Sequence, residues 1–148
     1  MEGKSYKSAA REIRAMIGLT LPQQQALNNL KGSLVKQGLN QDAIQSTTEK
    51  RIKTMIRDRA DTIARTETFA AISQGRQELW QQLKEEGVIE PTTQRVWLTA
   101  NDERECHICK PMNNQKQLLD AYFETGNGEQ IDAPPAHPNC RCTVILDL

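Results

Sequence analysis

The cysteines and histidines of this chain all lie in its C-terminal third, at spacings typical of a metal site. Cys106 and Cys109 form a CxxC knuckle, which brings two thiolates to one side of a tight turn. Cys140 and Cys142 are two residues apart, so an extended backbone points both side chains to the same face. His137 precedes them in a proline-rich approach that stiffens the loop. These five side chains are the candidate metal ligands.

This ligand set predicts a structural zinc ion. Such an ion takes four thiolate or imidazole ligands, and here five candidates fall into two groups about thirty residues apart. We expect about one zinc per chain, bound by Cys106, Cys109 and two of the three later candidates. The spacing leaves open a redox-active CxxC pair, disulfides between the two pairs, and buried free thiols. Because no secretion signal is apparent, disulfides are disfavoured. His107, inside the knuckle, is expected to be exposed.

The same residues give little indication of a catalytic site. A His-Asn-His type nuclease needs a catalytic and a metal-binding histidine besides its structural ligands, whereas this chain has two histidines in all. The sequence has no GxSxG elbow, GxxxxGK[ST] loop or HExxH helix. We therefore expect a protein that is not an enzyme.

Composition indicates a small core with an extended helical part. Nineteen basic and nineteen acidic side chains give a net charge of zero, which excludes the strongly basic class that coats nucleic acid. Hydrophobic residues make up 37%, aromatic residues only 4%, and the mean hydropathy is -0.66. The longest uninterrupted apolar run, Phe69–Ile72, is far too short to cross a membrane. Partners must therefore be sought in local patches of charge.

The two ends of the chain differ in charge and in type of residue. Residues 1–90 hold fourteen basic and eleven acidic side chains, whereas residues 91–148 hold five and eight. The first part is rich in helix-forming residues, and the second is rich in turn residues and contains five of the six prolines. We expect a helical extension over residues 1–54 and a domain over residues 55–148, with the Cys/His module at residues 95–146.

The first expected helix carries a basic stripe. Basic residues recur at three- and four-residue spacing before Gly18: Lys4, Lys7, Arg11 and Arg14. The simplest interpretation of the stripe is a helix face that is exposed to solvent. Because the sign of the stripe is nearly uniform, it also suits an acidic partner, and Lys7, Arg11 and Arg14 are our candidate partner-binding residues.

Two longer helices are expected next. Thr20 predicts an N-cap for a helix that ends at Gly38, and Asn40 predicts the cap of the following one. Apolar residues then recur at three- and four-residue spacing from about residue 41 to 86. This region is expected to form one bent helix or two, with Gly75 as its weakest point and Gly87 as its stop.

A second basic cluster lies on the long helical region. Its members are Lys50, Arg51, Lys53, Arg57 and Arg59. They suggest contacts to phosphates, so a zinc-stabilised nucleic-acid-binding module is our alternative function. A solvated face, partly balanced by neighbouring acidic residues, is the other interpretation.

Strand-like residues flank the Cys/His groups. Arg95–Thr99 is expected to form one strand, followed by a turn at Asn101 and Asp102, and Thr143–Leu146 a terminal one. Trp97 is expected to be the main aromatic anchor of a small core. The predicted class is therefore α+β, with N-terminal helices, a long helix and a small zinc-stapled module that contains β-strands.

The order of these motifs resembles the phage Mu F-like family of head morphogenesis, or minor capsid, proteins. The resemblance covers roughly residues 55 to 146. It is carried by ordered segments: Ala64–Thr68, Val96–Ala100 leading through Asp102 to the CxxC knuckle, Phe123, and the PPxHPxCRC string at residues 134–142. The terminal string is the most specific of them.

The resemblance implies a structural virion component of a tailed double-stranded DNA phage or prophage. Such a protein is made in the host cytoplasm and acts in procapsid assembly beside the portal. The implied partners are the portal or major capsid protein, with phage DNA and further copies around the portal as additional candidates, and no membrane.

The resemblance also marks individual structural residues. Arg65 and Glu67 match the helix motif, Trp97 and Asp102 match the strand and turn, and Arg141 lies within the cysteine pattern. Glu67 is expected either to pair with Arg141 or Arg95 or to remain a solvated carboxylate.

Overall fold

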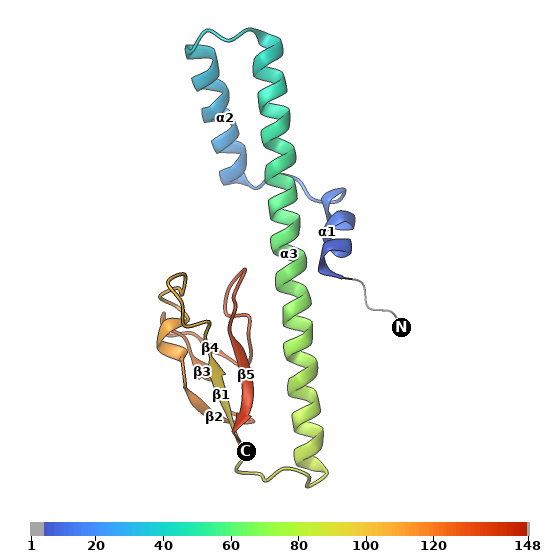
Figure 1. The fold of residues 1–148 in the computed structure, drawn as a ribbon, viewed down its shortest axis with the longest axis vertical. Helices are drawn as coiled ribbons and strands as arrows, with labels where there is room; N and C mark the ends of the chain where they lie inside the picture. The colour runs from blue at the N-terminus through green and yellow to red at the C-terminus, as the bar shows by residue number, and fades with distance from the viewer. Residues whose placement is uncertain (1–4, 148) are drawn as a thin grey trace. The chain divides into compact units, whose positions relative to one another are not determined.

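A computed structural model describes residues 5–147 and confirms the α+β class. The helices come first and the strands follow (Figure 1). The elements are α1 (Tyr6–Arg14), α2 (Leu21–Lys36), α3 (Gln41–Glu85), β1 (Gln94–Leu98), the short 3-10 helix η1 (Lys110–Met112), β2 (Lys116–Leu118), β3 (Phe123–Glu124), β4 (Gln130–Ile131) and β5 (Thr143–Asp147). By its contacts the chain divides into unit 1, Met1–Arg65, and unit 2, Thr66–Leu148.

The predicted helix caps are confirmed. The Thr20 hydroxyl accepts from the Gln23 backbone N–H at 3.4 Å, and the Gln23 side chain accepts from the Thr20 N–H at 2.9 Å, which is a capping box. Asn40 Oδ1 accepts from the Ala43 N–H at 2.8 Å at the start of α3. Gly87, with φ +71, ends that helix. The helix runs unbroken through Gly75, because one glycine weakens a helix without interrupting its hydrogen bonds.

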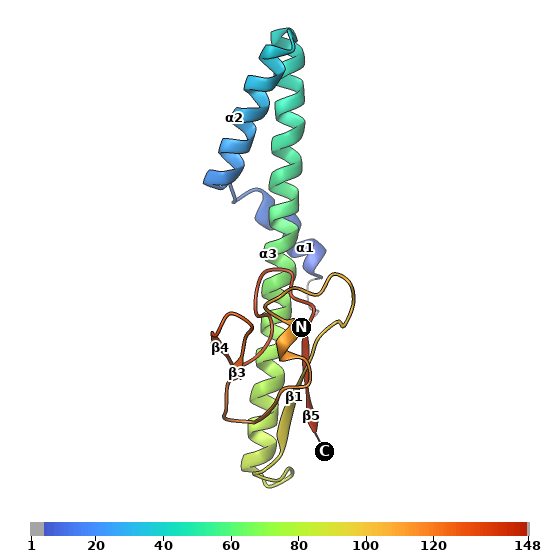
Figure 2. The same ribbon diagram turned by 90° about the vertical axis from the view of Figure 1, so that its left-hand side faces the viewer.

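In unit 1, α2 and the N-terminal part of α3 lie side by side in both views (Figures 1 and 2). Their buried side chains recur at four- and seven-residue spacing, as expected for two helices that pack along one stripe. These side chains are Leu27 and Leu34 on α2, and Ile44, Thr48 and Met55 on α3. The pairing therefore rests on a narrow apolar seam.

The short helix α1 packs through small residues. Ala10, Ala60 and Ala64 form a buried cluster, with Ile13 and Ile17 packed against it. Lys7 and Arg11 of the basic stripe are exposed. Lys4 lies outside the described residues.

Unit 2 contains a three-stranded antiparallel sheet in the order β2-β1-β5, and a two-stranded pair, β3-β4. In the central strand Trp97 lies opposite Val144 of β5, and Val96 lies opposite Lys116 of β2. The predicted strands at residues 95–99 and 143–146 are therefore confirmed, with bounds shifted by one residue.

The core of unit 2 forms around Trp97, which is fully buried, as predicted. Its ring meets Phe123 edge to face, with the centroids 5.2 Å apart. Trp80 joins this core from the C-terminal half of α3. On the same helix, the Arg76 guanidinium donates to Thr143 Oγ1 and to the Val144 carbonyl, each at 3.1 Å. The helix thereby fixes β5, the strand that follows the last cysteines.

Arg95 is the unexpected member of this core. Its side chain is completely buried on β1, yet it donates to the Asp132 carboxylate at 2.9 Å and to the Ala121 carbonyl at 2.6 Å. The guanidinium also lies over the Phe123 ring, 5.1 Å from its centroid. These contacts compensate for the burial of the charge.

None of the helices among residues 5–147 combines the length and the apolar character that a membrane crossing requires.

Candidate metal centre

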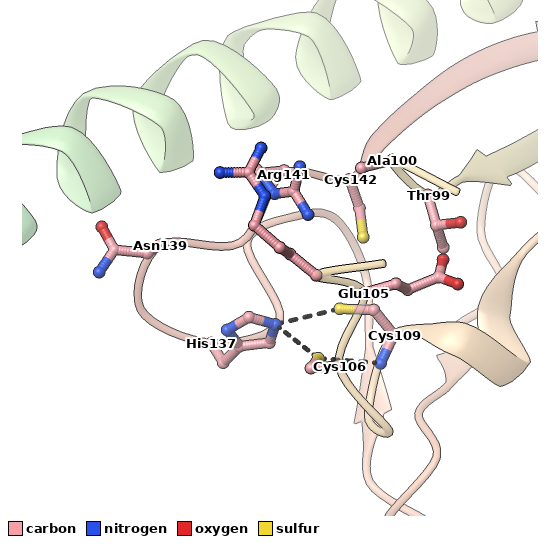
Figure 3. A pocket seen from close by; sticks show the side chains of 10 residues that line it. Thr99, Ala100, Glu105, Cys106, Cys109, His137, Asn139, Arg141 and Cys142 are labelled. Carbon is pink, nitrogen blue, oxygen red and sulfur yellow. Dashed lines mark hydrogen bonds between the residues drawn. The ribbon is translucent and has the colours of Figure 1, made fainter. Parts of the chain in front are cut away.

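The candidate ligands lie on two loops of unit 2. Cys106 and Cys109 occupy the turn that leads into η1, where the Cys109 N–H points to Cys106 Sγ at 3.4 Å. His137 and Cys140 lie on the loop that leads to β5, and Cys142 directly precedes that strand. Figure 3 shows the side chains of Cys106, Cys109 and His137 pointing toward one another.

All five predicted ligands are brought together, in two groups that share one thiol. The candidate donor atoms of Cys106, Cys109 and His137 lie within 4.8 Å of one another, and so do those of Cys109, Cys140 and Cys142. His137 Nε2 is 3.1 Å from the sulfur atoms of both Cys106 and Cys109 (Figure 3). Cys109 Sγ is 3.9 Å from Cys140 Sγ. Cys109 is therefore the centre of the cluster.

These distances fit tetrahedral zinc. A zinc–sulfur bond of about 2.3 Å places two thiolate ligands about 3.8 Å apart. The 3.9 Å between Cys109 and Cys140 matches that spacing. Sulfur and imidazole nitrogen ligands lie about 3.6 Å apart in the same geometry, so the two 3.1 Å contacts of His137 need only a small outward movement.

The backbone orients the His137 ring as metal-binding histidines are oriented. Its Nδ1 lies 2.9 Å from the Pro138 carbonyl oxygen, which only accepts hydrogen bonds. Nδ1 therefore carries the proton, and in the neutral ring the lone pair of Nε2 faces the thiols. A hydrogen bond of this kind orients most metal-binding histidines in proteins.

The thiols differ in how readily they ionise. Burial raises the pKa of Cys109 to about 12. The hydrogen bond with Cys142 lowers the pKa of Cys140 to about 5 and raises that of Cys142. The lowered pKa of Cys140 favours its thiolate, which is the form in which cysteine binds metals.

All four cysteines are free thiols, so the structure does not contain the disulfides that the spacing left open. His107 is exposed, as predicted.

An ion pair ties the two ligand loops together. Arg141 donates to both carboxylate oxygens of Asp102, at 2.5 and 2.6 Å, in the bidentate geometry that suits this pair. This contact holds the pKa of Asp102 well below its usual range. Sequence reasoning singled out both residues but missed their pairing. The Cys-Arg-Cys order gave an indication of this pairing. Side chains alternate along an extended backbone, so Arg141 must point away from the face that carries Cys140 and Cys142 and toward another partner.

The predicted pairing of Glu67 with Arg141 or Arg95 is wrong. Arg141 binds Asp102 and Arg95 binds Asp132, so both arginines have other carboxylate partners. Glu67 is exposed, as is Arg65. The alternative of a solvated carboxylate therefore describes Glu67.

A small pocket opens beside the thiols. Its volume is about 50 Å³, and Thr99 and Glu105 line it together with four of the candidate ligands, Cys106, Cys109, His137 and Cys142 (Figure 3). Thr99 Oγ1 and Glu105 Oε1 are buried without hydrogen-bond partners. Sequence reasoning did not identify either residue.

In unit 1 the basic stripe of α1 and the basic cluster of α3 contribute side chains to the same hollow. Arg14 of α1 lines a hollow of about 460 Å³ with Lys53 and Arg57 of α3. Acidic neighbours already bind two of these cations: Arg14 pairs with Asp61 and Arg57 with Asp58, both at 3.0 Å. The positive charge of the hollow is thereby reduced.

Comparison with known protein families identifies a family that the chain matches. The family model described as Phage Mu protein F like protein matches residues 1–145. The match therefore includes the N-terminal helices, whereas the motifs of the resemblance lie in roughly residues 55 to 146. No curated protein and no solved structure matches the chain.

Proposed function

Because the chain belongs to the phage Mu protein F-like family, we propose that it is a structural protein of phage head assembly, a minor component of the virion made in the bacterial host. The family match over residues 1–145 is the observation that carries this proposal. The role needs no catalysis, and we propose that the chain is not an enzyme.

Within the head we place the protein in the procapsid, beside the portal and in several copies. The portal or the major capsid protein is the proposed partner, and the exposed basic face of α1 is the proposed contact. Lys7 and Arg11 lie on that face, whereas Arg14 is engaged by Asp61. An acidic surface on the partner would complement these side chains.

We further propose that zinc stabilises unit 2. Cys106, Cys109 and His137 are three of its ligands, and Cys140 or Cys142 supplies the fourth. The bound ion provides a structural cross-link between the two ligand loops and takes part in no reaction. The proposal is supported by the sulfur spacing and by the orientation of His137.

A charge-reversal experiment in phage heads tests the proposed role. Lys7→Glu with Arg11→Glu should leave folding intact, because both side chains are exposed, and should reduce the amount of the protein in purified heads about tenfold. Quantitative mass spectrometry of the heads measures that amount.

The matched control reverses two exposed lysines of α2. Lys31→Glu with Lys36→Glu changes the net charge equally, and the protein should be incorporated normally. Normal incorporation of the α1 variant would contradict the proposed contact, and absence of the unmodified protein from heads would contradict the function itself.

Nucleic-acid binding is the second candidate, favoured by the hollow that Arg14, Lys53 and Arg57 line. A DNA-binding module shows an affinity that falls steeply with salt, with a slope set by its phosphate contacts. Titration of a short DNA duplex at several salt concentrations, with Lys53→Ala as a comparison, distinguishes this function from assembly alone.

A further inference from the structure

The turn of the β3–β4 hairpin lies directly against the backbone of the CxxC knuckle. The Gly126 N–H donates to the Ile108 carbonyl oxygen at 2.9 Å, and Ile108 lies between the two knuckle cysteines. A glycine in such a place often marks a site where another backbone approaches closely. The hairpin and the knuckle therefore meet through main-chain atoms.

The space beside Gly126 excludes a side chain. A Cβ atom at this position would lie 2.3 Å from the His107 carbonyl oxygen, and 3.0 Å from both the Ile108 carbonyl oxygen and Pro111 Cγ. At the other glycines of residues 5–147 the same position is open space. The backbone of Gly126 is not left-handed, so it is the close contact with the knuckle that requires a glycine here.

Hydrogen bonds on both sides prevent the hairpin from moving away. The Thr125 N–H donates to the Glu129 carbonyl at 2.8 Å, and Thr125 Oγ1 accepts from the Glu129 N–H at 2.9 Å. The side-chain amide of Gln115 donates to the Glu124 carbonyl at 2.8 Å and accepts from the Glu124 N–H at 3.1 Å. Because Gln115 follows η1 closely, the hairpin is anchored to the same segment that carries the knuckle.

The knuckle turn sets the positions of two candidate ligands at once. The Cys106 carbonyl accepts from the N–H groups of Cys109 and Lys110 at 3.2 and 3.0 Å, and the Cys109 N–H also points to Cys106 Sγ. Metal–ligand distances tolerate deviations of only about 0.2 Å. A displacement of this backbone would therefore move both sulfur atoms away from their places opposite His137.

We propose that Gly126 is a positioning residue of the metal site, which fixes the places of Cys106 and Cys109 through the backbone of the knuckle. The proposal deepens the proposed function and rests on the zinc site proposed there. Groups that support metal ligands typically change metal affinity by about 10- to 100-fold.

Gly126→Ala in the full, zinc-loaded chain tests this role. Competition with a chelator of known affinity should show zinc bound about 10- to 100-fold more weakly, because the added methyl group displaces the knuckle. Cobalt(II) in place of zinc supplies a spectroscopic readout, since its visible absorption depends on the tetrahedral arrangement of sulfur and nitrogen ligands. The cobalt bands of the variant should shift and lose intensity.

Two controls separate displaced ligands from a general loss of stability. Gly75→Ala makes the same substitution where space is open, and it should bind zinc and absorb with cobalt like the unmodified chain. Leu119→Ala removes a buried side chain from the core of unit 2. It should lower the unfolding temperature and leave the cobalt spectrum of the folded protein unchanged.

A second variant loosens the hairpin without a clash. Thr125→Val keeps the branched shape of the side chain and removes the hydroxyl that accepts from Glu129. It should weaken zinc binding about fivefold, the equivalent of one hydrogen bond. If Gly126→Ala does not fold, this variant alone decides.

Unchanged zinc affinity and cobalt spectra in these two variants would overturn the proposal. A less stable Gly126→Ala protein with an unchanged cobalt spectrum would also overturn it, because the glycine would then serve packing only. An unmodified chain that binds neither metal would contradict the zinc site itself and the positioning role with it. Variants that match an unmodified chain that does bind metal contradict the positioning role alone.

Discussion

At the scale of single residues, Cys109 matters most, because both groups of candidate ligands include it. It is buried and lies within hydrogen-bonding reach of His137 and Cys140. A serine in its place keeps the size of the side chain but replaces a soft thiolate with a poor zinc ligand. The effect on stability therefore separates a metal ligand from a buried free thiol.

We expect Cys109→Ser to lower the free energy of unfolding of unit 2 by about 4 kcal/mol or more, as loss of a structural metal does. His107→Ala, two residues away and exposed, should change it by less than about 0.5 kcal/mol. Thermal and denaturant unfolding of the two variants, monitored by tryptophan fluorescence, provides the measurement. Equal losses of stability would show that the knuckle is oriented differently.

Residue types and spacing predicted which side chains form the candidate metal cluster, but they did not predict the contacts that support it. The positions of Cys106, Cys109, His137, Cys140 and Cys142 could be read from short intervals along the chain. The pairs Arg141–Asp102 and Arg95–Asp132 join residues 39 and 37 positions apart. Such contacts depend on how the loops fold back, and the sequence alone does not specify that.

At the scale of elements, caps made the helices predictable. The side chains of Thr20 and Asn40 bond to the first turns that they precede, so the signal is local and can be read directly. By contrast, β3 and β4 have two residues each, too few to show a strand period. The helix boundaries were therefore clear in advance, and the small hairpin was not.

The alanine contact between α1 and α3 gives a prediction at this scale. Ala64 is 2% exposed and packs with Ala10, so Ala64→Leu should overpack the contact and cost about 1–3 kcal/mol. Amides of α1 should then exchange with solvent at least about tenfold faster. Ala71→Leu, at an exposed site on the same helix, is the matched control. Hydrogen exchange that is unchanged in α1 would contradict this packing.

At the scale of the whole molecule, the neutral chain consists of two oppositely charged units. Unit 1 has twelve basic and six acidic side chains, and unit 2 has seven and thirteen. The charge difference is larger than a division at Pro91 suggests, because Glu67, Glu78, Glu85, Glu86 and Glu90 belong to unit 2. An assembly protein with two such surfaces can engage an acidic and a basic neighbour together.

Native mass spectrometry tests most directly whether a metal ion holds unit 2 together. Protein purified without added metal or chelator should carry about one zinc ion per chain. Removal of that ion by a strong chelator should unfold the strands of unit 2, since so small a core depends on its metal, and should leave the helical signal of unit 1. A protein that carries no metal while unit 2 remains folded would contradict a structural role for the metal.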